Sequence, residues 1–437
     1  MLATASAPGK VSRSKTSNAM LPWMIALGTV VVLTVGVIWR FEVLQRQTTP
    51  QTIAHGSGRR NAAHRADPVR TREQMMADWT ARCKRDRSAF HIDTRSGSLS
   101  IEKSEIATAF DRCQRQPLGA DGRRLRSLVA NASSTSVECP FLMSVYDPEA
   151  RGKHREFFQP DKASIAIRDT GAWLRRETAL VQDLPSDSLI VDVGARLGWH
   201  TLVALSLGHR VIAFEPLPAN KALLSHSLCL NHGLDERLSL QEVAVSEQNA
   251  CTIASAQDEA SLGILVCGAE QERAVRSGEG SAALAEVWKA DSEERVPVQT
   301  SRLDSLLDDL DEQIDLLRID CFGHELSVVR SGGDLFHVRR GSSSAAARLP
   351  PAYILSNFSP RHMALLGYQP IEYLDFFANR GYQVAIVNKN LEGIYTAASG
   401  SPKAHHVIKR NEFDTLIKEV WDTSVTLEMS LLDHISD

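Results

Sequence analysis

The sequence predicts an α/β protein with a doubly wound parallel sheet, preceded by a transmembrane helix, a flexible stem and a small helical segment. Residues 189–216 run through an apolar stretch, a turn of small residues, a helical stretch and a second apolar stretch. Apolar runs at 314–319 and 353–358 add further strands. Short apolar runs of this kind are typical of strands buried on both faces of a parallel sheet. Residues 19–39 predict the membrane helix, because they are uncharged and almost all apolar.

The first strand of the sheet, Leu189–Val193, is apolar except for Asp192. Small residues follow it at Gly194, Ala195 and Gly198. Glycine lets a backbone turn sharply and approach a ligand, because it carries no Cβ. Asp192 can satisfy amides of this turn or meet the positively charged end of a ligand. We therefore expect a ligand to bind at this turn, beyond the carboxyl end of the strand.

An acidic residue closes the second strand of the same stretch. Trp199–Leu207 predicts a helix that ends at Gly208, and Val211–Phe214 predicts a strand followed by Glu215. Glu215 lies 21 positions after Gly194, about the separation at which an acid accepts hydrogen bonds from a ribose. The turn reads G-x-x-x-G rather than the G-x-G-x-x-G of dinucleotide-binding folds. This spacing favours a nucleoside ligand without a pyrophosphate.

Downstream segments complete the predicted domain. Leu217–Asn231 predicts a helix and Leu238–Val245 a strand. Residues 251–294 are polar and weakly patterned, which predicts a loop or an irregular insertion. Residues 401–437 are expected to form a C-terminal extension, in which Val420–Ile435 is a helix packed on the outside.

The chain begins with a basic tail, residues 1–18, followed by the apolar stretch 19–39. That stretch has the roughly 20 residues that a membrane-spanning helix needs, with tryptophans near both ends, where interfacial aromatics are enriched. One span behind a short basic tail predicts a type II signal anchor, with the rest of the chain facing the lumen of the endoplasmic reticulum or Golgi. A cleaved signal peptide or a buried core helix is the alternative. Residues 40–72 contain few large apolar side chains and predict a flexible stem.

Residues 73–160 predict a helical N-terminal region, with two helices on either side of the polar loop 93–98. The region holds three cysteines: Cys83, Cys113 and Cys139. An oxidising lumen allows a disulfide, most plausibly Cys83–Cys113, while buried thiols are an equal alternative. Asn131-Ala132-Ser133 is an N-glycosylation acceptor in a Ser/Thr-rich stretch, which predicts an exposed position in a glycoprotein.

Composition narrows the function classes. The net charge of −4 gives no sign of nucleic-acid binding. The sequence has no C-x-x-C motif and no pair of histidines at ligand spacing beside an acid, so we expect no metal site. A phosphate-binding loop and the G-x-S-x-G motif of hydrolases are also missing from the sequence.

Six short motifs resemble the FkbM-type S-adenosylmethionine-dependent methyltransferases. They are VDVGARLGWHT at 191–201, VIAFEP at 211–216, the pair Leu230-Asn231, EVAVS at 242–246, RLDSLL at 302–307 and IDLLRIDCFGHE at 314–325. The resemblance extends from about Leu184 to Val387 and implies a Rossmann-like methyltransferase domain over residues 161–400. It also implies S-adenosylmethionine as the methyl donor. A Rossmann-like domain for another nucleotide is the alternative, because fold alone does not fix function.

The resemblance also implies roles for individual residues at the donor site. The amino-acid end of the donor would be surrounded by Asp192, Gly194, Ala195 and Gly198. Glu215 would hold the ribose, and Val243 would lie near the adenine, where a backbone amide usually reads the ring. The family implies an oxygen as methyl acceptor, so we expect an O-methyltransferase that acts on a sugar hydroxyl of a glycan or glycoconjugate.

Two acids of the family pattern are missing from this chain. Phe322 replaces the first Glu of Lys-Ile-Asp-Val-Glu-Gly-x-Glu, and Asn357 replaces an acid in the next strand. Asp320, Glu325 and His324 remain as candidate catalytic residues, the acids as a base or a positioning group and the histidine as a group that titrates near neutral pH. Each has a structural alternative: a turn cap for the aspartate, a helix-dipole partner for the glutamate, and a surface position for the histidine.

Two other functions therefore stay open. The missing acids fit a catalytically degenerate binding module that keeps the donor pocket. An oxidoreductase with a nicotinamide cofactor is a further alternative, which the G-x-x-x-G spacing disfavours.

Overall fold

The computed structural model describes residues 81, 83, 90–92, 99–101, 113, 127–132, 137–147, 161–231, 233–256, 259–269, 271, 295–337, 349–387 and 406–431. The chain divides into two compact units, residues 1–69 and 70–437, and every described residue belongs to the second. The predicted tail, membrane span and stem, residues 1–72, lie outside the described residues. Among the residues that are described, none forms a helix long and apolar enough to cross a bilayer.

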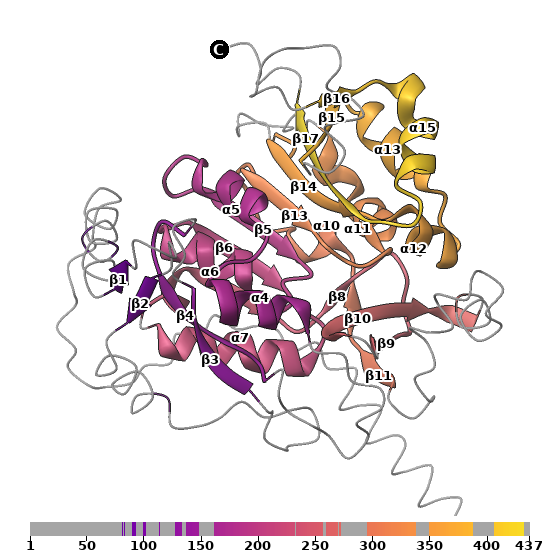
Figure 1. Ribbon diagram of the computed structural model, residues 1–437. Coiled ribbons are helices and arrows are strands. Elements are labelled where there is room, and N and C mark those ends of the chain that lie inside the picture. Colours follow the sequence, from indigo (N-terminus) through magenta and orange to yellow (C-terminus); the bar gives the residue numbers. More distant parts are fainter. Residues whose placement is uncertain are drawn as a thin grey trace, which may run out of the picture. The chain divides into compact units, whose positions relative to one another are not determined.

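An eight-stranded sheet lies at the centre of the second unit (Figure 1). In spatial order its strands are β16 (His406–Ile408), β15 (Tyr382–Ile386), β17 (Val425–Leu431), β14 (Tyr353–Phe358), β13 (Leu316–Ile319), β5 (Leu189–Val193), β6 (Arg210–Phe214) and β7 (Leu238–Gln241). The strands from β14 to β7 are parallel, and β17 is antiparallel to both of its neighbours. The chain order runs outward in opposite directions from β5 and β13, which confirms the predicted doubly wound α/β class. A ligand crevice is therefore expected at the carboxyl ends of these two strands.

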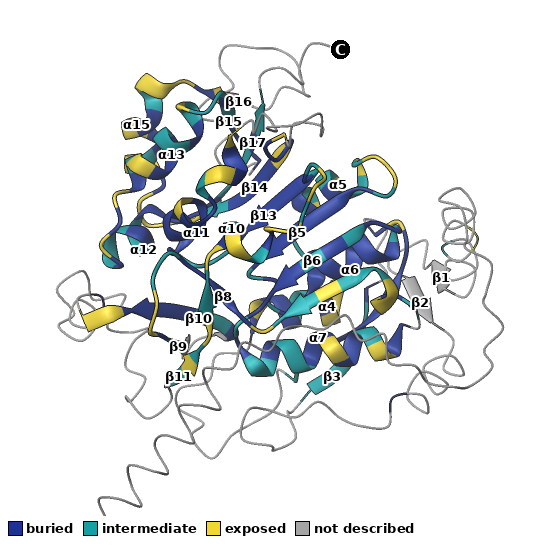
Figure 2. Ribbon diagram, turned by 180° about the vertical axis from the view of Figure 1, so that it is seen from behind, coloured by how far each residue is buried: buried dark blue, intermediate teal, exposed yellow. Residues whose placement is uncertain are grey.

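Helices cover both faces of this sheet, each face with its own apolar core. One face packs against α4 (Lys162–Thr170), α5 (Arg175–Gln182), α6 (Trp199–Ser206) and α7 (Pro218–Leu230). The other packs against α10 (Leu303–Leu306), α11 (Glu325–Ser331), α12 (Pro360–Leu365), α13 (Pro370–Ala378) and α15 (Phe413–Glu419). Because both faces are covered, all five residues of β5 are buried, and the central strands are dark blue in Figure 2. This explains why the strands are continuous apolar runs in the sequence.

A small three-stranded sheet replaces the irregular insertion expected at residues 251–294. Its order is β10 (Glu259–Cys267), β9 (Cys251–Ala256) and β11 (Arg295–Val298). Cys251 and Cys267 lie opposite each other in the β9–β10 hairpin and form a disulfide. The expectation is wrong for β9 and β10, because these strands pack apolar side chains into a separate small core with Leu217. Residues 272–294 of the expected insertion lie outside the described residues. A short parallel pair flanks this small sheet in the sequence: β8 (Ala244–Val245) precedes β9, and β12 (Thr300–Ser301) follows β11.

The predicted helix pair in the N-terminal region is wrong at residues 90–92 and 99–101, although residues 81 and 83 are helical as expected. Strands β1 (Phe90–Ile92) and β2 (Leu99–Ile101) form an antiparallel pair, and a second antiparallel pair follows, β3 (Ser127–Ala132) and β4 (Phe141–Tyr146). Asn131 lies in β3 and is half-buried, so the acceptor sequence begins in a strand rather than in an exposed loop.

The disulfides differ from the expected pairing. The predicted Cys83–Cys113 bond is wrong, because Cys83 pairs with Cys139 and Cys113 pairs with Cys229 of α7. The second bond ties the N-terminal region to the central domain, across 116 positions of sequence. Cys321 is a free thiol.

The C-terminal segment belongs to the central sheet and is not an outer extension. The predicted helix 420–435 is wrong, because Val425–Leu431 forms β17, between β14 and β15. Its side chains alternate between buried and half-buried positions, the period of a strand and not of a helix. Residues 406–431 therefore complete the domain that was expected to end at residue 400.

Candidate functional site

The turn after β5 depends on two glycines with left-handed backbones. Gly194 has φ +82°, and a Cβ at this position would overlap the backbone carbonyl oxygen of Asp320. Gly198 has φ +84°, and a Cβ there would overlap the side chain of Leu224 in α7. Glycine therefore allows the end of β5 to meet the end of β13, and α6 to pack against α7.

Glu215 at the tip of β6 points back toward this turn. Its Oε2 accepts a hydrogen bond from the backbone N–H of Arg196 at 2.6 Å. Its Oε1 accepts from the N–H of Leu217 at 3.0 Å and from Nδ2 of Asn220 at 3.1 Å. Burial raises the pKa of Glu215 to about 7, although the three N–H donors partly offset this effect. The acid predicted to hold a ribose thus lies beside the bend, with protein donors on both of its oxygens.

A buried arginine links the ends of β5 and β13. Arg318 Nη1 donates to Oδ1 of Asp192 at 2.8 Å, and Nη2 donates to Oδ2 of Asp320 at 2.7 Å. Asp192 also accepts from the Thr201 hydroxyl at 2.6 Å. Both oxygens of Asp192 are therefore engaged inside the protein, and its side chain is 1% exposed. Asp192 does not border the cavity described below, so it supports the site from behind.

Asn357, at the position of the second missing acid, contacts the same network. Its Nδ2 donates to Oδ1 of Asp320 at 3.2 Å. Asp320 therefore has a donor on each oxygen, one cationic and one neutral. An acid at position 357 would bring a second negative charge close to Asp320, whereas the amide donates a hydrogen bond to it.

A cavity of about 60 Å³ lies between the turn and the β9–β10 hairpin. One wall is apolar and includes Leu217, Val243 and Val245, and the opposite wall comes from Ile253 and Leu265 of the hairpin. The predicted residues Gly194, Glu215, Asp320 and His324 also border it. The space holds a few water molecules, so a nucleoside would need the hairpin to move outward.

A polar cluster holds the hairpin down over Glu215. Ser261 of β10 is bonded to Asp161, the N-cap of α4, through both its N–H and its hydroxyl. Arg196 Nε donates to the Ser261 hydroxyl at 2.5 Å, and its Nη2 donates to Asp161 at 3.1 Å. Asn220 donates to the carbonyl of Ser261 at 2.9 Å while also holding Glu215. Residues from four separate segments thus close the cavity on one side.

Glu325 and His324 are buried and bonded within the protein. Glu325 accepts from the N–H groups of Cys321 and Gly323, at 3.1 and 2.8 Å, and burial raises its pKa to about 7. Glu325 holds the turn after β13 and is the first residue of α11. This arrangement favours a structural role for Glu325 over a role as a reacting group.

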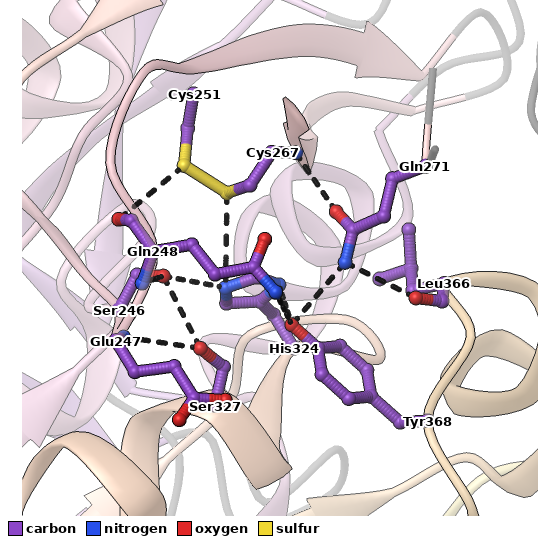
Figure 3. The surroundings of a disulfide bond; sticks show 10 residues. All are labelled: Ser246, Glu247, Gln248, Cys251, Cys267, Gln271, His324, Ser327, Leu366 and Tyr368. Carbon is purple, nitrogen blue, oxygen red and sulfur yellow. Dashed lines mark hydrogen bonds between the residues drawn. A yellow bond between two sulfur atoms is a disulfide. The ribbon is translucent and has the colours of Figure 1, made fainter. Parts of the chain in front are cut away.

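His324 lies in a buried polar network beneath the hairpin disulfide (Figure 3). Its Nε2 lies 3.0 Å from the Ser246 hydroxyl and 4.0 Å from Sγ of Cys267, and its Nδ1 lies 3.4 Å from the Tyr368 hydroxyl. Burial lowers the pKa of His324 to about 3. The predicted titration of His324 near neutral pH is therefore wrong, because the buried ring stays neutral. The alternative of a surface histidine is also wrong, because the residue is 1% exposed.

The structure thus separates the predicted residues into two groups. Those that border the cavity are Gly194, Glu215, Val243, Asp320 and His324. Those that lie behind it are Asp192, Ala195, Gly198 and Glu325. Sequence reasoning missed Arg196, Ser261 and Arg318, although the buried position of Arg318 within an apolar strand was a signal. Within the described ranges, no cluster of three or more His, Cys, Asp or Glu side chains is arranged to hold a metal ion.

Comparisons with known proteins identify the central region. Residues 192–384 match the model of the methyltransferase FkbM domain, which confirms the resemblance that the sequence motifs indicated. No curated protein matches the chain.

Solved structures also match the chain, at low identity and low TM-score. A precorrin-6y C5,15-methyltransferase from Geobacter metallireducens is 13% identical, with a TM-score of 0.29, over 63% of this chain and 95% of that one. A methyltransferase FkbM from Methylobacillus flagellatus is 14% identical, with a TM-score of 0.29, over 56% of this chain and 44% of that one. An rRNA methylase from Streptococcus thermophilus is 11% identical, with a TM-score of 0.28, over 60% of this chain and 99% of that one.

Proposed function

We propose that the domain that contains the methyltransferase FkbM match is an S-adenosylmethionine-dependent O-methyltransferase that acts on a sugar hydroxyl of a glycan or glycoconjugate. The observation that carries the proposal is the position of Glu215. Its carboxylate lies at the tip of β6, 2.6 Å from a backbone N–H of the glycine-bearing turn after β5. A carboxylate at this point of a doubly wound sheet is placed to accept from the hydroxyls of a ribose.

The residues around the cavity fit the chemistry of the donor. Val243, Leu217 and Ile253 offer apolar walls for a flat purine, and Glu215 offers oxygens for two hydroxyls. Gly194 keeps the turn free of a side chain that would cover the donor's amino-acid end. When bound, S-adenosylmethionine supplies a methyl group on a positively charged sulfur.

Phe322 supports a sugar as the acceptor. Its ring borders the cavity and is half-buried, and its backbone is held at φ +50°. A positive φ is strained for a bulky residue and often marks a functional site. The aromatic ring can pack against the apolar C–H face of a sugar while Asp320 holds a neighbouring hydroxyl.

A methyl-transfer assay tests the proposal. The full-length protein in detergent is incubated with S-adenosylmethionine labelled at its methyl group and with a panel of glycans, and the products are analysed for O-methyl sugars. Label in a sugar ether is the expected result. No transfer to any glycan, with donor binding intact, would contradict the enzymatic assignment.

A second function, a binding module without turnover, is favoured by one specific observation. Phe322 and Asn357 stand at two positions where the family pattern has acids, so two carboxylates that could serve the reaction are missing from this chain. Calorimetry combined with the transfer assay separates the two functions, because a binding module would bind the donor and transfer nothing.

We also propose that the domain faces the lumen of the endoplasmic reticulum or Golgi, anchored by the apolar stretch 19–39. Three disulfides support this location, because such bonds persist in oxidising compartments. A half-buried Asn131 would then be available for glycosylation. Protection of the domain from protease in intact microsomes, with a glycosidase-sensitive mobility that Asn131→Gln removes, is the expected result. Digestion by protease from the cytosolic side would contradict it.

A further inference from the structure

Ser359, which follows β14 as the N-cap of α12, and His362 in the first turn of α12 form a serine–histidine pair that the sequence analysis did not single out. The Ser359 hydroxyl lies 2.5 Å from Nδ1 of His362. Ser359 is buried, whereas His362 is half-buried. The second ring nitrogen of His362, Nε2, makes no hydrogen bond within the described part of the chain. A histidine with one nitrogen fixed by a hydroxyl and the other open is suited to accept a proton.

This pair lies at the same edge of the sheet as the cavity. Strands β13 and β14 are parallel neighbours, so the turns that follow them meet at one edge. The His362 ring lies 4.2 Å from the ring of Phe322, which borders the cavity. Gly323 packs so tightly on His362 that a Cβ there would lie 2.8 Å from the histidine backbone. The turn after β13 and the first turn of α12 are therefore in contact through Phe322 and Gly323.

The other polar groups near these two turns are poor proton acceptors. Asp320 has Arg318 on one oxygen and Asn357 on the other, so both of its oxygens already accept hydrogen bonds from the protein. Glu325 uses its carboxylate to hold two backbone N–H groups. His324 is buried with hydrogen-bond partners at both nitrogens.

We propose that His362 is the catalytic base that takes the proton of the acceptor hydroxyl, and that Ser359 is its positioning residue. This inference rests on the proposed methyltransferase function. In the step, the hydroxyl oxygen forms a bond to the methyl carbon, and the carbon–sulfur bond breaks with its electron pair going to sulfur. The hydroxyl proton passes to Nε2 of His362 and from there to water. Phe322, beside the histidine, would support the sugar ring that carries this hydroxyl.

The electrostatic surroundings keep the base in its neutral form. Burial and the neighbouring Arg361 lower the pKa of His362 to about 4, so Nε2 has a free lone pair at neutral pH when the proton is on Nδ1. The charge of Arg361 is partly balanced by Asp422, which lies 2.9 Å away. The Ser359 hydroxyl then accepts a hydrogen bond from Nδ1–H, which fixes the ring orientation.

The test uses the full-length protein with His362→Gln, His362→Ala and Ser359→Ala. Both His362 variants should lower kcat by about 10²- to 10⁴-fold, the usual contribution of a general base, with the dissociation constant of S-adenosylmethionine unchanged. Added imidazole should restore part of the rate of His362→Ala but not of His362→Gln, whose side chain fills the site. Ser359→Ala should lower kcat less, and Ser359→Thr, which keeps the hydroxyl, should restore it. His337→Gln, at an exposed histidine, is the matched control and should change nothing.

Chemical modification of His362 provides a second measurement that does not depend on methyl transfer. Diethyl pyrocarbonate should modify His362 of the wild-type protein in preference to the buried His324, as mapped by mass spectrometry, and a bound acceptor glycan should protect it. A kcat within threefold of wild type in His362→Gln would overturn the proposal, as would an unreactive His362. No methyl transfer by the wild-type protein would instead overturn the proposed function, and the base role with it.

Discussion

Arg318 and Asp192 face each other on the neighbouring strands β13 and β5, with Nη1 of the arginine 2.8 Å from Oδ1 of the aspartate. Their side chains are 7% and 1% exposed. The second arm of the same guanidinium reaches Asp320 at the end of β13. One buried cation thus fixes two aspartates near the adjacent carboxyl ends of β5 and β13.

Arg318→Met should destabilise the protein by about 3–5 kcal/mol, because it leaves a buried carboxylate without its charged partner. Arg318→Lys keeps the charge but cannot reach both aspartates, so it should lose less stability than Arg318→Met. Denaturant unfolding measures the stability of both variants. Arg302→Met, which breaks an exposed pair with Asp304, is the control and should cost at most about 1 kcal/mol. Equal losses for the buried and exposed pairs would refute this account.

The buried Glu215 should make stability depend on pH. Its pKa is raised from 4.5 to about 7 in the folded protein, so the folded state binds this proton more tightly than the unfolded chain. Its contribution to the free energy of unfolding is fully present below pH 4.5 and is lost as the pH rises to about 7. The free energy of unfolding of the wild type, relative to that of Glu215→Gln, should therefore fall by roughly 3 kcal/mol between pH 4.5 and about 7. A difference that is constant with pH would show that Glu215 titrates normally.

Gly194→Ala should lower the stability of the protein by more than the strain of a left-handed backbone alone explains. Gly194 and Gly381 both have φ +82°, but a Cβ at Gly381 meets open space, whereas one at Gly194 overlaps Asp320. Gly381→Ala should cost about 1–2 kcal/mol of conformational strain. Gly194→Ala should add about 1–3 kcal/mol of steric strain and weaken donor binding. Thermal and denaturant unfolding compare the two, and equal costs would contradict the close approach of the two strand ends.

Removal of the hairpin disulfide should affect the donor site as well as stability. Cys251→Ser with Cys267→Ser opens a loop of 16 positions, which in the chain-entropy model costs about 3 kcal/mol. Donor affinity should also fall, because the β9–β10 hairpin forms one wall of the cavity. The control is Cys83→Ser with Cys139→Ser, which should lower stability and leave donor affinity unchanged. The same affinity loss in both pairs would argue against a specific role of the hairpin.

The central motif could be predicted because its physics is local. Buried parallel strands are continuous apolar runs, so β5, β6 and β14 were predicted with nearly the observed bounds. The turn between β5 and α6 was predicted from its small residues. In the structure, two of them, Gly194 and Gly198, have positive φ values.

The remaining features depend on contacts between segments far apart in the sequence. Val425–Leu431 has the alternation of a strand, but its place between β14 and β15 is set by pairing with both. The partner of Cys113 is 116 positions away, a pairing that spacing cannot reveal. Ser261 meets Asp161 across 100 positions, so the closure over Glu215 was not visible in any single motif.

The most direct test of the donor site is calorimetric titration of the full-length protein with S-adenosylmethionine, beside Glu215→Gln and with NAD as a competitor. We expect one molecule bound per chain, no competition by NAD, and affinity lowered about 10- to 100-fold in the variant, the effect of one lost hydrogen bond to a charged group. Absence of binding by the wild-type protein, or equal affinity in Glu215→Gln, would contradict the assignment of this cavity to the methyl donor.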